Sequence, residues 1–148
     1  MGNKVRIAIK GIRSMDGEQE PVDEAGLGDH YIRKGKHYII WRHGESIAKR
    51  IKITGTSMTV TEADGGNAMD FEKGRRCCTL YGASAGRLLL EIMTHEFRVR
   101  EEERFLEAEA EYSLYHGNIH ISDNRIKVTV VFLEDREADM LPAGTQSD

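Results

Sequence analysis

The segment 104–115 alternates apolar and polar side chains without interruption, and this alternation limits the fold more than any other feature of the sequence. One face carries Leu106, Ala108, Ala110, Tyr112 and Leu114. The opposite face carries Phe105, Glu107, Glu109, Glu111 and Ser113. A period of two residues is typical of a β-strand with one buried and one solvated face. The segment 87–100 precedes it across the acidic turn 101–103, so we expect one long antiparallel hairpin.

Most of the chain repeats this pattern. Alternation predicts further strands at 4–13, 22–33, 36–42, 47–54, 57–62, 69–71, 77–81 and 124–133. Turn residues separate them roughly every eight to twelve positions, and a sustained helical stripe is absent from the sequence. We therefore predict an all-β fold, an antiparallel up-and-down β-barrel of about 8–10 strands. Residues 1–134 would form this single domain, and residues 135–148, where the periodicity stops, a flexible C-terminal tail.

Two Gly-containing dipeptides are expected to make tight turns between neighbouring strands. Asp16-Gly17 follows the first strand, and Lys34-Gly35 separates the second strand from the third. If the second turn has two residues, Tyr31 lies opposite Tyr38 and His30 lies opposite Ile39.

Composition excludes several classes of protein. The formal net charge of −4 and a pI near 5.9 argue against a general nucleic-acid binder, which needs a basic face. The apolar runs are too short for a membrane span, so we expect no membrane association. The two cysteines, Cys77 and Cys78, are adjacent and poorly placed to pair with each other, which favours a reducing cytoplasm.

The order of several short motifs resembles that of the YwiB-like family of uncharacterised bacterial proteins. These motifs are Gly28-Asp29-His30-Tyr31, Lys34-Gly35-Lys36-His37-Tyr38-Ile39, Ile51-Lys52-Ile53, Phe71-Glu72-Lys73-Gly74, Tyr81, Gly86, Thr94 and Ser122-Asp123-Asn124. The resemblance implies a calycin-like barrel, related in shape to lipocalins and fatty-acid-binding proteins, and implies no assigned activity. The chain departs from the family at Arg42-His43, where an acidic pair is usual, and at Ala63, where an arginine is usual.

The long hairpin holds the only candidate binding residues that we single out. A turn centred on Glu102 would pair Arg98 with Leu106, Glu96 with Ala108 and Thr94 with Ala110. The inner face would then be apolar at one end and polar at the other, beside small alanines that leave room for a ligand. We therefore predict a ligand-binding site formed by Thr94, Glu96, Arg98 and Tyr112.

A competing interpretation of the same strand places two of these residues outside the barrel. If the strand bends at Thr94, Glu96 and Arg98 are exposed at the rim, and Phe97 and Val99 carry the apolar signal on the opposite parity. An apolar signal that changes face along a strand is typical of a β-bulge.

Other chemistry-bearing residues form no catalytic or metal-binding signature. The sequence has six histidines, and no spacing among them completes a set of zinc ligands. His30, His37 and His43 share one face of the second hairpin with apolar neighbours, which is more typical of a structural surface than of a metal site. We therefore expect a non-enzymatic barrel without a cofactor that binds an unidentified small ligand. The alternative is a protein-interaction module whose barrel is filled by side chains.

Overall fold

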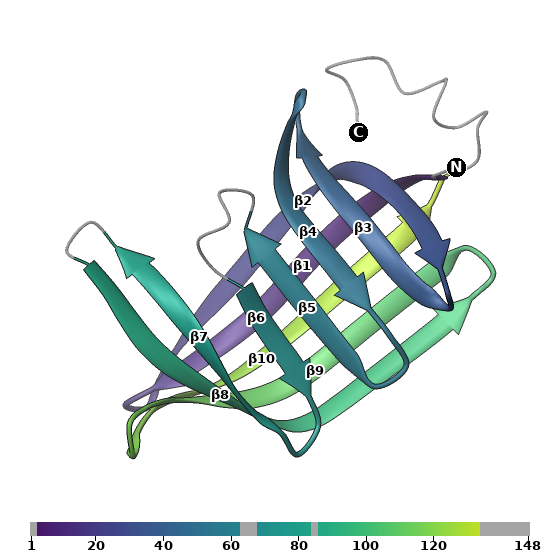
Figure 1. Cartoon of the computed structure of the whole chain (residues 1–148). Helices are drawn as coiled ribbons and strands as arrows, with labels where there is room; N and C mark the ends of the chain where they lie inside the picture. The colour runs from purple at the N-terminus through teal and green to yellow at the C-terminus, as the bar shows by residue number, and fades with distance from the viewer. Residues whose placement is uncertain (1–2, 63–67, 84–85, 134–148) are drawn as a thin grey trace.

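The computed structural model describes residues 3–62, 68–83 and 86–133, and all of its regular structure is antiparallel β-sheet (Figure 1). The strands are β1 (Asn3–Met15), β2 (Glu18–Arg33), β3 (Lys36–His43), β4 (Ser46–Ile53), β5 (Ser57–Glu62), β6 (Ala68–Glu72), β7 (Arg76–Ala83), β8 (Gly86–Glu102), β9 (Phe105–His116) and β10 (Ile119–Phe132). The predicted all-β class is confirmed. The predicted C-terminal tail, residues 135–148, lies outside the described residues.

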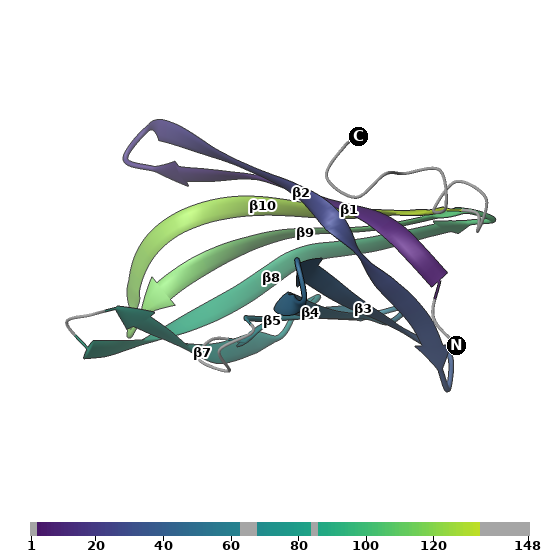
Figure 2. The same cartoon turned by 90° about the horizontal axis from the view of Figure 1, so that it is seen from above.

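The strands form one sheet in the order β6-β5-β4-β3-β2-β1-β10-β9-β8-β7, and this sheet curls into a nearly closed barrel (Figures 1 and 2). Paired strands are consecutive in the chain, except that the first strand, β1, pairs with the last, β10. The consecutive strands β6 and β7 are the two ends of the sheet. At this β6–β7 edge, the Thr79 hydroxyl of β7 donates a hydrogen bond of 2.6 Å to the Ala68 carbonyl oxygen of β6. The up-and-down barrel predicted from the sequence is therefore confirmed, and its shape is consistent with a calycin-like fold.

Two predicted turns have the geometry that their residues favour. Asp16-Gly17 and Lys34-Gly35 both place two successive residues at positive φ, between 52° and 80°. This backbone matches the twist of a two-residue hairpin. The register after the second turn pairs Tyr31 with Tyr38 and His30 with Ile39, as predicted.

Two strands begin several residues before the position that their alternation indicated. The second strand begins at Glu18 rather than at residue 22, and the last begins at Ile119 rather than at residue 124. Residues 18–22 are exposed on both faces, and residues 119–120 are also exposed. Backbone pairing continues there without burial of either face, so no alternation marks it.

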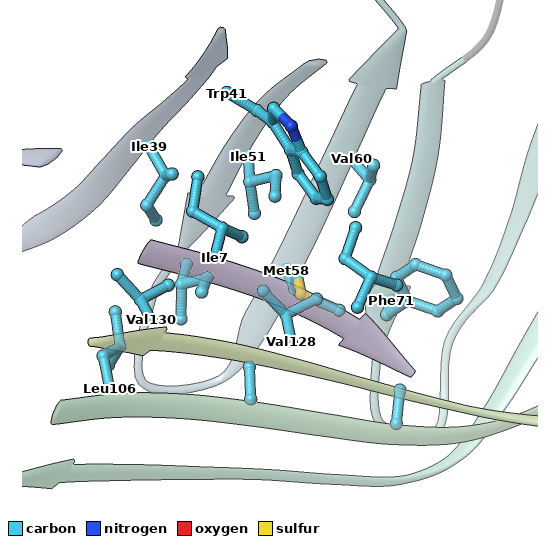
Figure 3. Packing of buried hydrophobic residues seen from close by; sticks show 14 of the residues in the cluster. Ile7, Ile39, Trp41, Ile51, Met58, Val60, Phe71, Leu106, Val128 and Val130 are labelled. Atoms are coloured by element: carbon cyan, nitrogen blue, oxygen red, sulfur yellow. The ribbon is translucent and has the colours of Figure 1, made fainter. Parts of the chain in front are cut away.

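The core is a single apolar cluster to which strands on both sides of the barrel contribute (Figure 3). Its largest fully buried hydrophobic side chains are Phe71, Ile7, Ile39, Ile51, Ile53, Met58, Ile92 and Leu106. Ala108 and Ala110 are also fully buried, as predicted. Trp41 lies against the bare backbone of Gly26, where an added Cβ would collide with the indole ring. The centre of the barrel is therefore filled by side chains rather than open.

The register of the long hairpin differs from the prediction. Glu101 pairs with Leu106, Val99 with Ala108 and Phe97 with Ala110. The predicted pairings of Arg98 with Leu106, Glu96 with Ala108 and Thr94 with Ala110 are therefore all wrong. The ladder shifts between Thr94 and Glu96, which leaves His95 as the extra residue of a β-bulge. The bend at Thr94 that the competing interpretation required is therefore confirmed.

Candidate binding sites

The structure divides the four predicted site residues between the two faces of the barrel wall. Thr94 and Tyr112 are cross-strand partners on β8 and β9 and point inward. Thr94 is 0% exposed, and the Tyr112 ring packs against Phe71 at 4.8 Å between ring centroids. These two residues come together as predicted.

Glu96 and Arg98 face solvent, so the prediction that they line the interior is wrong. The Arg98 side chain is 52% exposed and its Nη2 donates to Glu109 at 3.1 Å and to Glu111 at 3.0 Å. These carboxylates raise the pKa of Arg98 further above its ordinary value. Glu96 forms an ion pair with Lys73 at 3.3 Å. The bulge at His95 shifts the parity of every β8 residue that follows it, which is the cause of the error.

Thr94 and Tyr112 belong to a longer row of polar side chains that crosses four strands and ends at the partly exposed Arg13. The register pairs Thr94 with Tyr112, Tyr112 with Asn124 on β10, and Asn124 with Arg13 on β1. We call Arg13, Asn124, Tyr112 and Thr94 the polar row. Asn124 and Arg13 could not be predicted as members of this row, because the register across four strands is a tertiary property that no single strand displays.

The polar row contains one buried group without a partner. Thr94 Oγ1 has no hydrogen-bond partner among the described residues, whereas the Asn124 amide donates to the Ser122 hydroxyl at 3.1 Å. Burial raises the pKa of Tyr112 to about 12, against a smaller lowering by Arg13. The phenol therefore stays protonated and available as a donor. At the end of the row, Arg13 forms an ion pair with Glu20 at 2.9 Å.

A second buried polar cluster lies at the end of the barrel where the β2–β3 and β8–β9 turns are found (Figure 1). His30 Nε2 lies 2.8 Å from His37 Nδ1, and His37 Nε2 lies 3.2 Å from Glu101 Oε1. We call these three residues the histidine chain. His30 also stacks on Phe132 at 4.5 Å between ring centroids.

His30 is the most deeply buried member of the histidine chain. Its side chain is 1% exposed, and its Nδ1 atom has no partner in the described part of the molecule. Burial, together with a smaller effect of the nearby His37, lowers the pKa of His30 to about 4, against an opposing effect of Glu101. His30 is therefore neutral near pH 7. His43, predicted to share this face, is exposed and does not join the chain.

A third network lies on the outer face, beside the bulge. His95 Nε2 contacts Ser113 Oγ at 2.7 Å, and Ser113 Oγ donates to Asp123 Oδ1 at 2.6 Å. The bonds from Ser113 and His120 hold the pKa of Asp123 below its usual range. Ser113 is only 2% exposed and lies between the histidine and the carboxylate, so its oxygen is not free to attack a substrate. Within the described ranges, no group of three or more histidine, cysteine, aspartate or glutamate side chains could hold a metal ion.

The outer wall formed by β1, β2, β9 and β10 carries an open groove of about 320 Å³. Its lining includes apolar residues and three cations: Ile12, Pro21, Val22, Lys10, Arg125 and Lys127. The carboxylates Asp23 and Glu109 also line it, and Glu109 is already paired with Arg98. This groove offers an exterior contact surface.

The adjacent cysteines have different environments. Both are free, as predicted, with Cys77 half-buried and Cys78 exposed. Burial, followed by the effect of Asp70, raises the pKa of the Cys77 thiol. A raised pKa disfavours the nucleophilic thiolate, so Cys77 is not activated.

Comparison with known proteins supports the fold and the family. Residues 7–128 match the sequence profile of a domain of unknown function, DUF1934. The crystal structure of ywiB protein from Bacillus subtilis is similar to this chain, with 18% sequence identity and a TM-score of 0.75 over 90% of this chain and 94% of that chain. A search of curated proteins finds no match. The resemblance inferred from motif order is thereby confirmed. Among the described residues, no helix has the length and apolar character needed to span a membrane.

Proposed function

Because this chain belongs to the DUF1934 family, a YwiB-like group with a barrel fold, we propose that it is a non-enzymatic protein that binds a small molecule inside its barrel. The site would be the polar row together with Phe71, at the end of the barrel away from the histidine chain. The free thiols of Cys77 and Cys78 favour a reducing compartment such as the cytoplasm.

The unpartnered hydroxyl of Thr94 is the observation that carries this proposal. A buried polar group without a hydrogen bond costs about 1–3 kcal/mol, and folded proteins rarely keep one without a reason. A ligand with a hydroxyl, amide or carbonyl group would satisfy Thr94 Oγ1 and the Tyr112 phenol together. Its apolar part would pack on Phe71 and Ile92, which are 0% exposed.

The β6–β7 edge offers a route to this site. Met69 on β6 and Cys77 on β7 are inward-facing residues, yet each is only half-buried. Solvent therefore reaches the inner wall next to this edge. Because β6 and β7 are the two ends of the sheet, their separation would break no ladder of backbone hydrogen bonds between them.

The polar row can be tested by paired substitutions on the two faces of the hairpin. A thermal-shift screen of small acids, lipids and nucleotides would first identify a compound that stabilises the parent protein. Thr94→Val and Tyr112→Phe each remove one inner hydroxyl and should weaken that compound's binding about fivefold to tenfold. Glu96→Gln and Arg98→Ala change the outer face of the same strand and are the matched controls. Loss of the shift in the controls alone would place the ligand outside the barrel.

A second candidate function rests on the outer groove and the filled centre of the barrel. In that case the protein is an interaction module, and a partner protein contacts Ile12, Val22 and the cations around them. Native mass spectrometry of protein purified from its own host separates the two functions. A small mass increment supports the interior site, and an additional polypeptide supports the module.

A further inference from the structure

The histidine chain connects an exposed carboxylate to a buried ring nitrogen, and neither proposed binding surface uses it. Glu101 is 58% exposed in its side chain, His37 is 8% exposed, and His30 lies behind them under Phe132. We infer that Glu101, His37 and His30 form a proton relay, and that His30 Nδ1 is a buried proton acceptor at its inner end.

The direction of the hydrogen bonds follows from Glu101. An ionised carboxylate only accepts, so His37 Nε2 must carry a proton and donate it at 3.2 Å. In a neutral His37 the other ring nitrogen, Nδ1, is then an acceptor. The 2.8 Å contact therefore requires His30 Nε2 to be the donor. Neutral His30 is left with a bare lone pair on Nδ1, the atom that has no partner among the described residues.

One proton added at the inner end moves through the chain without loss of any hydrogen bond. A hydronium ion from solvent supplies one proton to His30 Nδ1, and the proton on His30 Nε2 passes to His37 Nδ1. His37 becomes an imidazolium that still donates to Glu101, and His30 stays neutral with its proton now on Nδ1. The relay thus takes up one proton, turns the buried acceptor into a donor, and places the positive charge beside a carboxylate.

The charges around the chain favour this arrangement. Glu101 on β8 is the carboxylate bonded to the chain, and among the described residues it is the anion that acts on His30. Lys4 and Asp29 pair with each other at 3.0 Å on the outer face of β1 and β2. Arg104, in the β8–β9 turn, donates to the Phe132 carbonyl at 3.1 Å. An imidazolium at His37 is therefore stabilised by Glu101, whereas one at His30 would be buried behind Phe132.

Long-range nitrogen–proton NMR of the histidine rings tests the relay, because it shows which ring nitrogen carries each proton. At neutral pH, His30 and His37 should both be protonated on Nε2. On acidification, His37 should become the imidazolium while His30 stays neutral and its proton moves to Nδ1. A wild-type His30 protonated on Nδ1 at neutral pH would overturn the relay. So would direct formation of an imidazolium at His30.

Substitution of the carboxylate separates a relay from a purely structural cluster. Glu101→Leu should lower the pH midpoint at which the histidine pair takes up its proton by about one pH unit. Glu101→Gln keeps the shape of the side chain and should shift the midpoint in the same direction if the leucine variant folds poorly. Glu102→Gln is the matched control, and the exposed His43 is an internal reference; neither should shift. An unchanged midpoint in both Glu101 variants contradicts the proposal.

Discussion

At the scale of single residues, two buried polar atoms distinguish this barrel from a purely apolar one. Thr94 Oγ1 and His30 Nδ1 are the buried side-chain atoms that lack a hydrogen-bond partner in the described ranges. They belong to separate clusters, the polar row and the histidine chain. A fold that only needed stability would gain from apolar groups of similar shape at both positions. The proposed ligand site uses the first of these atoms, and the proposed proton relay uses the second.

Replacement of the unpartnered Thr94 hydroxyl tests whether this group lowers the stability of the ligand-free protein. Thr94→Val replaces the buried hydroxyl with a methyl group of similar size, so the free energy of unfolding should rise by about 1 kcal/mol. The measurement is chemical denaturation of the ligand-free protein. Thr61 on β5 is half-buried, so Thr61→Val is a control that should change the free energy of unfolding less. A loss of stability in Thr94→Val would show that the hydroxyl has a partner after all.

The lowered pKa of His30 predicts a dependence of stability on pH. The unfolded chain protonates His30 near its ordinary pKa of about 6.5, whereas burial keeps the His30 ring neutral in the folded protein down to about pH 4. Acid therefore favours the unfolded state. This contribution to stability is complete above pH 6.5 and is lost as the pH falls from about 6.5 to 4, up to about 3 kcal/mol.

Denaturation curves across this pH range measure the effect. His30→Phe keeps an aromatic ring against Phe132 but cannot take up a proton, so its stability should depend less steeply on pH. His43→Phe, at an exposed position, is the control and should keep the parent slope. Equal slopes for parent and His30→Phe would assign the acid sensitivity to other groups.

At the scale of elements, the β-bulge in β8 decides which side chains face the core. Thr94 points inward before the bulge, and Phe97 and Val99 point inward after it. On the outer face, Glu96 pairs with Lys73 and Arg98 pairs with carboxylates. His95, the extra residue, contacts Ser113 on the outer face. The bulge thus lets one long strand of 17 residues follow the curvature of the barrel.

Alanine substitutions of side chains on the two faces of β8 test this corrected register. Phe97→Ala removes an aromatic ring that packs against the core and should lower the free energy of unfolding by about 2 kcal/mol. Arg98→Ala removes an exposed side chain and should leave the urea midpoint nearly unchanged. The reverse order of these two effects would restore the register predicted from the sequence.

At the scale of the whole molecule, the barrel is nearly closed, and the weakest contact between adjacent strands is the one between β6 and β7. The other neighbouring strands of the sheet are joined by backbone ladders, but across the β6–β7 edge the Thr79 hydroxyl binds the Ala68 carbonyl. The proposed ligand would enter here. Local opening of this edge therefore links the architecture to the proposed function.

Hydrogen exchange can measure this opening directly. Thr79→Val removes the hydrogen bond across the edge, so amides of β6 should exchange several times faster, while those of β1 and β10 keep their protection. Thr79→Ser retains the hydroxyl and should behave like the parent. Unchanged β6 exchange in Thr79→Val would mean that the edge is held by packing alone.

The sequence by itself determined the strands, the tight turns and the all-β class, because alternation and turn chemistry are local properties of the chain. It also determined the inward faces of β9 and β10, where no bulge interrupts the period of two within 122–132. Thr94 and Tyr112 could each be predicted to face inward, but the predicted partner of Thr94 was Ala110, whereas the structure pairs Thr94 with Tyr112. Glu96 and Arg98 could not be placed, since one extra residue at His95 reverses parity and the local sequence does not show which residue is extra.

Only the tertiary structure decided which distant residues meet. Arg13 and Asn124 join the polar row because β1 pairs with β10, and that pairing depends on closure of the sheet. Glu101 reaches His37 across 64 positions of sequence because the curled sheet brings β8 to the β2–β3 turn. A strand displays which of its faces is buried, but it carries no mark of the partner that buries it.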